Sequence, residues 1–342
     1  MHIPDGYLSP QTCAVMATMA VPVLGIAASK LKKTLKDKQV PLLAIGAAFS
    51  FTIMMYNVPI PDGTTAHAVG ASILAIILGP WAATVGVSIA LIIQAFFFGD
   101  GGVLALGANI INMAFIIPFV SYYLYKLISG KSKISSNRRF IGSIIAGYIA
   151  ITMGALCAGI ELGLQPLLFH TVNGTPLYAP YTLIQTIPAM LFAHLTLAGS
   201  VEGVVTGFVV KYLQKSNPAM LQIYPPQTIA IEKSHIIVNI KKYWYALFAL
   251  IIFAPLGLLA QGTAFGEWSS GDLKSKIGFI PNGMAKLGNT WKAMLPDYTI
   301  PGFNSSLFKS SLGYIFCAIV ALVIILTITT IISLLLKRKN PY

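Results

Sequence analysis

Charged side chains are scarce in this chain. Asp, Glu, Lys and Arg together make up 10% of the 342 residues, whereas 56% are hydrophobic, and the mean hydropathy is +0.76. A soluble globular protein is about 25% charged. Because so few charges cannot cover a water-facing surface, the composition excludes a soluble enzyme and a disordered chain. It predicts an integral membrane protein.

Acidic residues and cysteines are rarer still. Ten Asp and Glu stand against 23 Lys and Arg, which gives a net charge of +13. In a soluble protein such an excess of basic residues suggests nucleic-acid binding, but in a membrane protein it indicates basic loops that set the orientation of the spans. We therefore expect membrane lipid, and no nucleic acid, as a partner. The three cysteines, Cys13, Cys157 and Cys317, lie far apart in apolar stretches. This spacing excludes a disulfide scaffold and a paired-cysteine metal site.

The sequence also lacks motifs for catalysis and for ATP hydrolysis. Gly130-Lys131-Ser132 resembles the end of a phosphate-binding loop, but Tyr125 stands where the loop needs its first glycine. There is no nucleophile elbow and no HExxH zinc motif. We therefore predict a protein that is not an enzyme, with no cofactor. Any uphill transport must be driven by a partner or by an ion gradient.

Long apolar stretches predict an all-α polytopic membrane protein, since about 20 residues of helix cross the hydrocarbon. We place spans at 9–29, 40–58, 67–79, 81–97, 104–127, 140–163, 183–210, 243–261 and 311–336. The third stretch is short and ends at Gly79-Pro80, so 67–97 is either two spans or a re-entrant hairpin. We expect three parts. They are a seven-span bundle over 1–213, a cytoplasmic linker over 214–242, and a two-span hairpin over 243–342 around an external loop, 262–309.

Basic residues orient these spans, because Lys and Arg gather on the cytoplasmic side. Eighteen of the 23 fall into four groups: Lys30, Lys32, Lys33, Lys36 and Lys38; Lys126, Lys131, Lys133, Arg138 and Arg139; Lys211, Lys215, Lys233, Lys241 and Lys242; and Lys337, Arg338 and Lys339. Nine crossings, or seven with a re-entrant hairpin, put all four groups inside when the N-terminus starts outside. We expect the C-terminus in the cytoplasm.

The N-terminus carries the clearest chemical signal. The chain begins Met1-His2 and has no basic region typical of a cleaved signal peptide, and His2 is too bulky for Met1 to be removed, so we expect a free Met1 amine. That amine, the deprotonated His2 amide and the His2 imidazole form fused chelate rings and leave one in-plane position open. We expect the His67 imidazole to fill it. Four planar nitrogens suit Ni²⁺ or Cu²⁺, and Co²⁺ more often takes a less flat site, so nickel is the first choice and cobalt the second.

A repeated turn accompanies both histidines. Ile3-Pro4-Asp5-Gly6 recurs as Ile60-Pro61-Asp62-Gly63, and both copies are predicted to lie outside. Asp5, Asp62 and Asn109 are candidates for hydrogen bonds that orient the ligands. The simpler alternative is favourable turn chemistry, a disordered His2 and a structural His67.

Three ionisable residues inside predicted spans give a different hypothesis. Glu161, His194 and Glu202 are costly in a bilayer and are therefore functional candidates. They form either the proton relay of a gradient-driven transporter or hydrogen bonds between helices.

The motifs resemble a known family. Met1-His2-Ile3-Pro4-Asp5-Gly6-Tyr7-Leu8-Ser9, with His67, looks like the nickel/cobalt substrate-capture subunit of energy-coupling-factor ABC transporters. Residues 262–268 and 295–302 resemble the two-span accessory subunit of the same systems, here fused in one chain. The resemblance implies metal bound by Met1, His2 and His67, and an ATP-driven importer in a prokaryotic cell membrane. It also implies a transmembrane coupling protein and cytoplasmic ATP-binding subunits as partners, and an accessory hairpin that assists metal loading.

Overall fold

The computed structural model describes residues 1–34, 40–60, 63–222, 240–260, 262, 264–303 and 305–337. Asp62 and most of the predicted linker therefore lie outside the described residues.

The regular secondary structure of the described chain is almost entirely helical, as its composition predicts. The α-helices are α1 (Pro10–Thr34), α2 (Val40–Met54), α3 (Ala71–Leu78), α4 (Pro80–Ile93), α5 (Leu106–Asn109), α6 (Ile117–Ser129), α7 (Asn137–Leu168), α8 (Leu183–Ala193), α9 (Gly199–Ser216), α10 (Ile240–Phe253), α11 (Ser270–Ile277), α12 (Asn282–Leu287) and α13 (Leu307–Lys337). Short 3₁₀ turns are η5 (Pro218–Gln222), η6 (Ala254–Leu259) and η7 (Pro296–Tyr298). The two strands β1 (Val58–Pro59) and β2 (Thr65–Ala66) pair antiparallel.

Three π-helical turns interrupt the described membrane helices. They are η2 (Gln94–Phe98) after α4, η3 (Ile110–Ile116) between α5 and α6, and η4 (His194–Ala198) between α8 and α9. A π-turn widens the helix and frees backbone groups, and such turns are frequent at functional sites. Here they occur beside polar residues of otherwise apolar spans, Gln94, Asn109 and His194.

Seven helices in the described ranges are long and apolar enough to cross a membrane. They are Pro10–Lys33, Pro80–Phe98, Leu106–Ser129, Asn137–Leu168, Leu183–Ser216, Lys241–Leu259 and Leu307–Ile332. Each matches one predicted span, and the all-α polytopic fold is confirmed. The other two predicted spans correspond to α2, of 15 residues, and α3, of 8. At 1.5 Å per residue α3 extends only about 12 Å, so it does not cross the hydrocarbon by itself.

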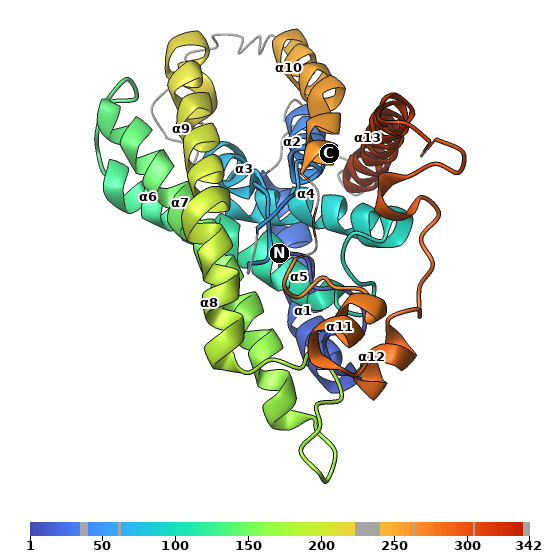
Figure 1. Ribbon diagram of the computed structural model, residues 1–342. Coiled ribbons are helices and arrows are strands. Elements are labelled where there is room, and N and C mark those ends of the chain that lie inside the picture. The colour runs from blue at the N-terminus through green and yellow to red at the C-terminus, as the bar shows by residue number, and fades with distance from the viewer. Residues whose placement is uncertain are drawn as a thin grey trace.

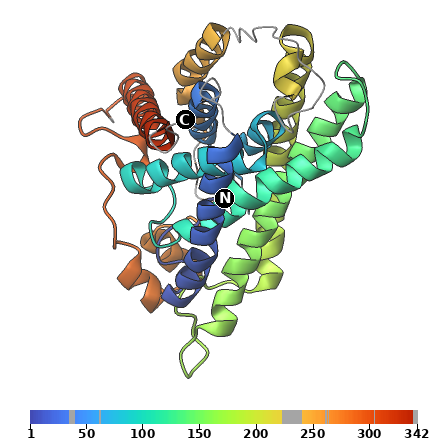
Figure 2. The ribbon, with the colours of Figure 1, turned by 180° about the vertical axis from the view of Figure 1, so that it is seen from behind.

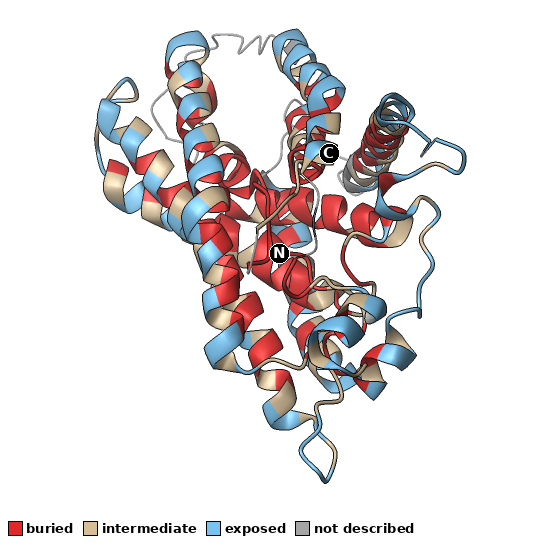
Figure 3. Ribbon diagram, viewed as in Figure 1, coloured by how far each residue is buried: buried red, intermediate tan, exposed pale blue. Residues whose placement is uncertain are grey.

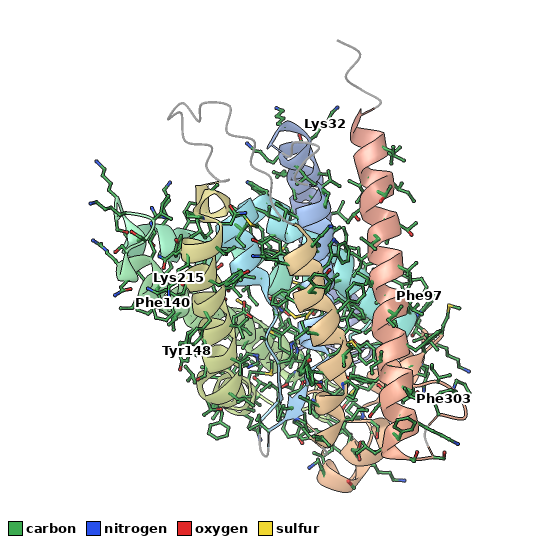
Figure 4. The ribbon with its side chains drawn as sticks, turned by 90° about the horizontal axis from the view of Figure 1, so that it is seen from above. Lys32, Phe97, Phe140, Tyr148, Lys215 and Phe303 are labelled. Carbon is green, nitrogen blue, oxygen red and sulfur yellow. The ribbon has the colours of Figure 1, made fainter. Side chains whose placement is uncertain are left out.

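The helices surround the first residues of the chain (Figure 1). The end of α9, the start of α10 and the α6–α7 turn lie at the upper end of that view, while α11, α12 and the loop after α7 lie at the lower end. From behind, α1 passes in front of α4 and contacts it (Figure 2). Figure 4 places Phe140, Tyr148 and Lys215 on one side of the protein, and Phe97 and Phe303 on the other side near α13.

Burial is greatest around the N-terminus and around α3 and α4 (Figure 3). Apolar side chains on the outward faces of the long helices are exposed instead; examples are Val21 on α1, Phe208 on α9 and Phe316 on α13. This distribution suits lipid outside and a packed polar site inside.

Glu202 fixes the short helix α3 and the segment before it. The side chain is 1% exposed, and its carboxylate accepts hydrogen bonds from the backbone N–H groups of Val69 (2.9 Å), Gly70 (2.8 Å) and Ser72 (3.2 Å). The first N–H groups of a helix have no partner within it, and they favour a negative charge. Glu202 therefore holds in place the segment that follows His67.

We expect Glu202→Ala to destabilise the protein by roughly 3 kcal/mol, because three buried N–H groups would lose their acceptor. Glu202→Gln should cost less, since one carboxamide oxygen remains. The measurement is thermal unfolding in detergent, with Ser200→Ala on the exposed face of the same helix as control. Equal melting temperatures for Glu202→Ala and Ser200→Ala would contradict this role.

Candidate metal centre

The first three residues lie in the centre of the protein. Met1, His2 and Ile3 are 1%, 5% and 1% exposed, and the N-terminus is surrounded by buried helices (Figure 3). Chain ends are usually exposed and poorly ordered unless they are tied down. The burial of this N-terminus therefore requires specific partners for its polar groups.

Asn109 ties down the backbone just after His2. Its Oδ1 accepts the Ile3 N–H at 2.8 Å, and its Nδ2 donates to the Ile3 carbonyl at 3.1 Å. The Gly102 N–H donates to the same carbonyl at 2.9 Å. Asn109 thus fixes the backbone of the residue that follows His2.

Asp5 acts in a similar way on the other side of the turn. Its carboxylate accepts the N–H groups of Val103 (3.1 Å), Leu104 (2.8 Å) and Ala105 (3.4 Å), just before α5. The two backbone segments approach so closely here that a Cβ on Gly102 would lie 2.4 Å from the Asp5 nitrogen, so only glycine fits. Asp5 anchors the N-terminal segment and takes its partners from the backbone.

The Met1 amine meets four groups in the buried centre. It lies 3.3 Å from His67 Nε2, 3.4 Å from Glu267 Oε1, and 3.5 Å from both the carbonyl oxygen and the Oγ1 of Thr65. A buried ammonium group needs such neighbours, because without a compensating charge or hydrogen bond its burial is costly. Glu267 supplies the opposite charge.

His2 and His67 lie side by side. Their ring centroids are 5.0 Å apart, and the ring planes differ by 22°. His2 Nδ1 is 3.2 Å from Asp100 Oδ1, whereas His2 Nε2 has no hydrogen-bond partner within the described part of the chain. His67 Nδ1 lies 3.2 Å from the carbonyl oxygen of Ala68, which leaves Nε2 directed at the Met1 amine.

Both imidazoles are poised to be neutral. Burial lowers the pKa of His2 below its ordinary value of 6.5, although the Asp100 carboxylate opposes this effect. Burial, together with the neighbouring Met1 ammonium, lowers the pKa of His67 well below the same value. A neutral imidazole nitrogen has a lone pair that can bind a metal. The environment therefore favours the ligand form of both side chains.

The three residues of the hypothetical proton relay have separate partners. Glu202 binds the backbone before α3. Glu161 accepts a hydrogen bond from Asn112 Nδ2 at 2.9 Å, and His194 Nδ1 lies 2.8 Å from the Met190 carbonyl. The Glu202 and Glu161 contacts join separate segments of the chain, as in the structural alternative given above, whereas the His194 contact lies within one helix.

Three residues at this centre were not among the predicted site residues. Thr65 and Glu267 contact the Met1 amine, and Asp100 contacts His2. Thr65 lies two residues before His67, and Asp100 belongs to a Gly-rich turn, so each has a nearby sequence feature that could have pointed to it. Glu267 has no such signal, because it is 266 residues away from Met1 along the chain.

The arrangement collects nitrogen donors rather than a cage of side chains. Over the described residues there is no group of three or more His, Cys, Asp or Glu side chains able to hold a metal ion. The amine, two imidazoles and the His2 backbone amide are instead close together. Nitrogen donors of this kind suit divalent nickel, cobalt and copper rather than magnesium or calcium.

Comparison with known proteins gives a family for both parts of the chain. The CbiM family, described as the cobalt uptake substrate-specific transmembrane region, matches residues 2–220, and the PDGLE domain matches residues 241–338. The fused nickel transport protein NikMN of Rhodobacter capsulatus is 45% identical over 340 residues, which cover 95% of each chain. The probable fused nickel transport protein LarMN of Lactiplantibacillus plantarum is 44% identical, again over 95% of each.

A solved structure agrees with these relatives. A crystal structure of a transition metal transporter is 63% identical, with a TM-score of 0.60, and the match covers 63% of this chain and 93% of that one. The relatives are transport proteins rather than enzymes, and nickel and cobalt are the metals in their names. This chain is therefore a multi-pass membrane transport protein of the CbiM family, fused to a PDGLE domain.

Proposed function

We propose that the chain captures a divalent transition metal ion, Ni²⁺ first and Co²⁺ second, through Met1, His2 and His67. The observation that carries the proposal is the buried Met1 amine, 3.3 Å from His67 Nε2, with the His2 ring alongside. The nickel transport relatives support this choice of metal.

The chelate requires two changes from the described geometry. The Met1 amine, the His2 amide and His2 Nδ1 are joined by short bonded paths, so one metal can bind all three in a plane. His67 Nε2 would then lie opposite the amide. Metal–nitrogen bonds of about 2 Å place neighbouring nitrogens about 2.8 Å apart, so the amine and His67 need to approach by about 0.5 Å. His2 Nδ1 must also leave Asp100.

We further propose that capture takes place on the outer face of a prokaryotic cell membrane and feeds an ATP-driven importer. The chain has no phosphate-binding loop, so ATP hydrolysis belongs to cytoplasmic subunits that act through a transmembrane coupling protein. Basic residues at the ends of α1, α6 and α9 favour a cytoplasmic position for these ends, with the N-terminus outside and the C-terminus inside. The C-terminal part (residues 240–337), whose segment 262–303 reaches the Met1 amine through Glu267, assists metal loading.

Removing the ligands should abolish capture. We expect His2→Ala, His67→Ala and a chain with one alanine added before Met1 each to lose at least about 100-fold in Ni²⁺ affinity, since each removes or displaces a ligand. Isothermal titration of the purified full chain measures the affinity and the stoichiometry.

His170→Ala is the matched control, because His170 is an exposed histidine in the loop after α7. It should bind one Ni²⁺ with unchanged affinity. One Ni²⁺ bound with unchanged affinity by the extended chain and by His2→Ala would refute the proposed site.

Affinity should also fall as the pH is lowered. Metal binding would displace one proton from the Met1 ammonium and one from the His2 amide, so protons compete with the metal. Both imidazoles have pKa values below 6.5 and are already neutral near pH 7, so they release no further proton there. We expect about two protons released per Ni²⁺ and about 100-fold weaker binding per pH unit between about pH 7.5 and 6.5.

Proton release is measured by repeating the titration in buffers with different ionisation enthalpies. Equal apparent enthalpies in all buffers, or an affinity that does not change with pH, would contradict the proposed ligand set.

A further inference from the structure

Basic side chains gather where the α6–α7 turn meets the end of α9, at the upper end of Figure 1. Gln214 of α9 joins the two, because its Nε2 donates to the carbonyl oxygens of Ile134 (2.6 Å) and Ser136 (2.9 Å). Lys211 Nζ likewise donates to Asn137 Oδ1 at 2.7 Å. The basic residues here, which we call the basic cluster, are Lys126, Lys131, Lys133, Arg138, Arg139, Lys211 and Lys215.

The described carboxylates leave this positive charge unbalanced. They lie around the Met1 amine, within the helices or in the segment 262–303, and they belong to Asp5, Asp100, Glu161, Glu202, Glu267, Asp272 and Asp297. In the described ranges the ion pairs are Met1–Glu267 and His2–Asp100, and both lie at the metal centre. Positive charges gathered without a counter-charge repel one another and attract an anion.

Two arginines of the cluster are held in place by the α6–α7 turn. Arg139 Nε donates to the Ser132 carbonyl at 3.0 Å, and one of its terminal nitrogens donates to the Tyr125 hydroxyl group at 3.4 Å. Arg138 Nε donates to the Ile128 carbonyl. Because a guanidinium group has five N–H donors, each arginine keeps further donors for an acceptor outside the protein. The planar guanidinium group matches phosphate oxygens, and a fixed one loses less conformational freedom on binding.

Exposed apolar side chains begin directly beside the cluster. Leu127 on α6, Ile141 on α7 and Phe208 on α9 are exposed, and each lies within one helical turn of a basic residue on the same helix. α6 and α9 both pack against α7, so these faces belong to one side of the bundle. A phospholipid carries its phosphate directly above its acyl chains, and one molecule can therefore contact both kinds of surface.

We propose that the basic cluster is a binding site for the headgroup of an anionic phospholipid, whose acyl chains lie along the exposed apolar side chains of α6, α7 and α9. Basic residues beside membrane helices attract anionic lipid, and basic pockets between such helices bind its headgroups. The preference of Lys and Arg for one side of the membrane accounts for their number. It does not account for two guanidinium groups fixed to one turn. The site is separate from the metal centre and independent of the proposed function.

The test follows thermal unfolding of the purified full chain in an uncharged detergent while phosphatidylglycerol is added. A ligand that binds the folded protein raises its melting temperature, and the midpoint of the rise reports the affinity. We expect a saturable rise with phosphatidylglycerol. Phosphatidylcholine, whose headgroup has no net charge, should have little effect. Inorganic phosphate at the same concentration should neither raise the melting temperature nor displace the lipid, since it has no acyl chains.

Two double variants remove charge from the cluster. Arg138→Gln/Arg139→Gln should shift the midpoint to at least about 10-fold more phosphatidylglycerol, because two basic residues near the headgroup are lost. Lys131→Gln/Lys133→Gln changes two exposed lysines and leaves the arginine hydrogen bonds intact, and it should shift the midpoint several-fold in the same direction. The lysine variant therefore tests the site even if the arginine variant fails to fold.

Lys32→Gln/Lys33→Gln is the matched control. It removes the same charge from two exposed lysines at the end of α1, and Figure 4 shows Lys32 well apart from Lys215 and Phe140. A lipid site at the basic cluster predicts an unchanged midpoint for this variant.

Several results would overturn the inference. Equal shifts in the control and in the cluster variants would mean that all basic residues attract lipid alike, without a site. Unchanged midpoints in both cluster variants, or an equal response to phosphatidylcholine, would also contradict the site. Displacement of the lipid by inorganic phosphate would assign the cluster to the free anion instead. None of these results bears on Ni²⁺ binding, so this inference and the proposed function fail separately.

Discussion

The position of the Met1 amine is the constraint on which the arrangement depends. A cationic group in a chain with so few charges cannot be buried without partners, and its partners come from two segments distant in the sequence. His67 and Thr65 come from the strand region before α3, and Glu267 from the C-terminal part. Asn109 and Asp5 fix the following backbone, so the amine cannot withdraw without breaking several hydrogen bonds.

The helices contribute by holding these segments at the correct places. Glu202 binds the start of α3 and so fixes the loop that carries His67. The turn at 99–102 follows the π-turn η2, and it brings Asp100 to His2 and Gly102 to Ile3. Polar groups of the apolar helices thus hold the loops that form the buried centre. This explains why an apolar bundle can support a centre made largely of nitrogen donors.

The sequence predicts much of the fold, because hydropathy alone identifies each long span. It fails to decide the 67–97 region, where α3 is too short to cross and its position depends on Glu202. Met1, His2 and His67 are recognisable from residue chemistry, since an amine and a nearby histidine form a chelate. Glu267 is not, because its contact with the Met1 amine joins positions 266 residues apart along the chain. The chemistry of Glu202 is visible in the sequence, but its backbone partners become evident only in three dimensions.

The charge of the Met1 ammonium group determines how the net charge of the centre changes when the metal binds. In the metal-free centre it contributes one positive charge, which Glu267 faces at 3.4 Å. After loading as proposed, a dipositive metal with one deprotonated amide also contributes one positive charge. The exchange of one metal ion for two protons is therefore electroneutral at the centre, and Glu267 and Asp100 would face the same net charge before and after it. Loading at such a centre would be insensitive to the membrane potential, so the voltage across the membrane would neither draw the metal in nor expel it.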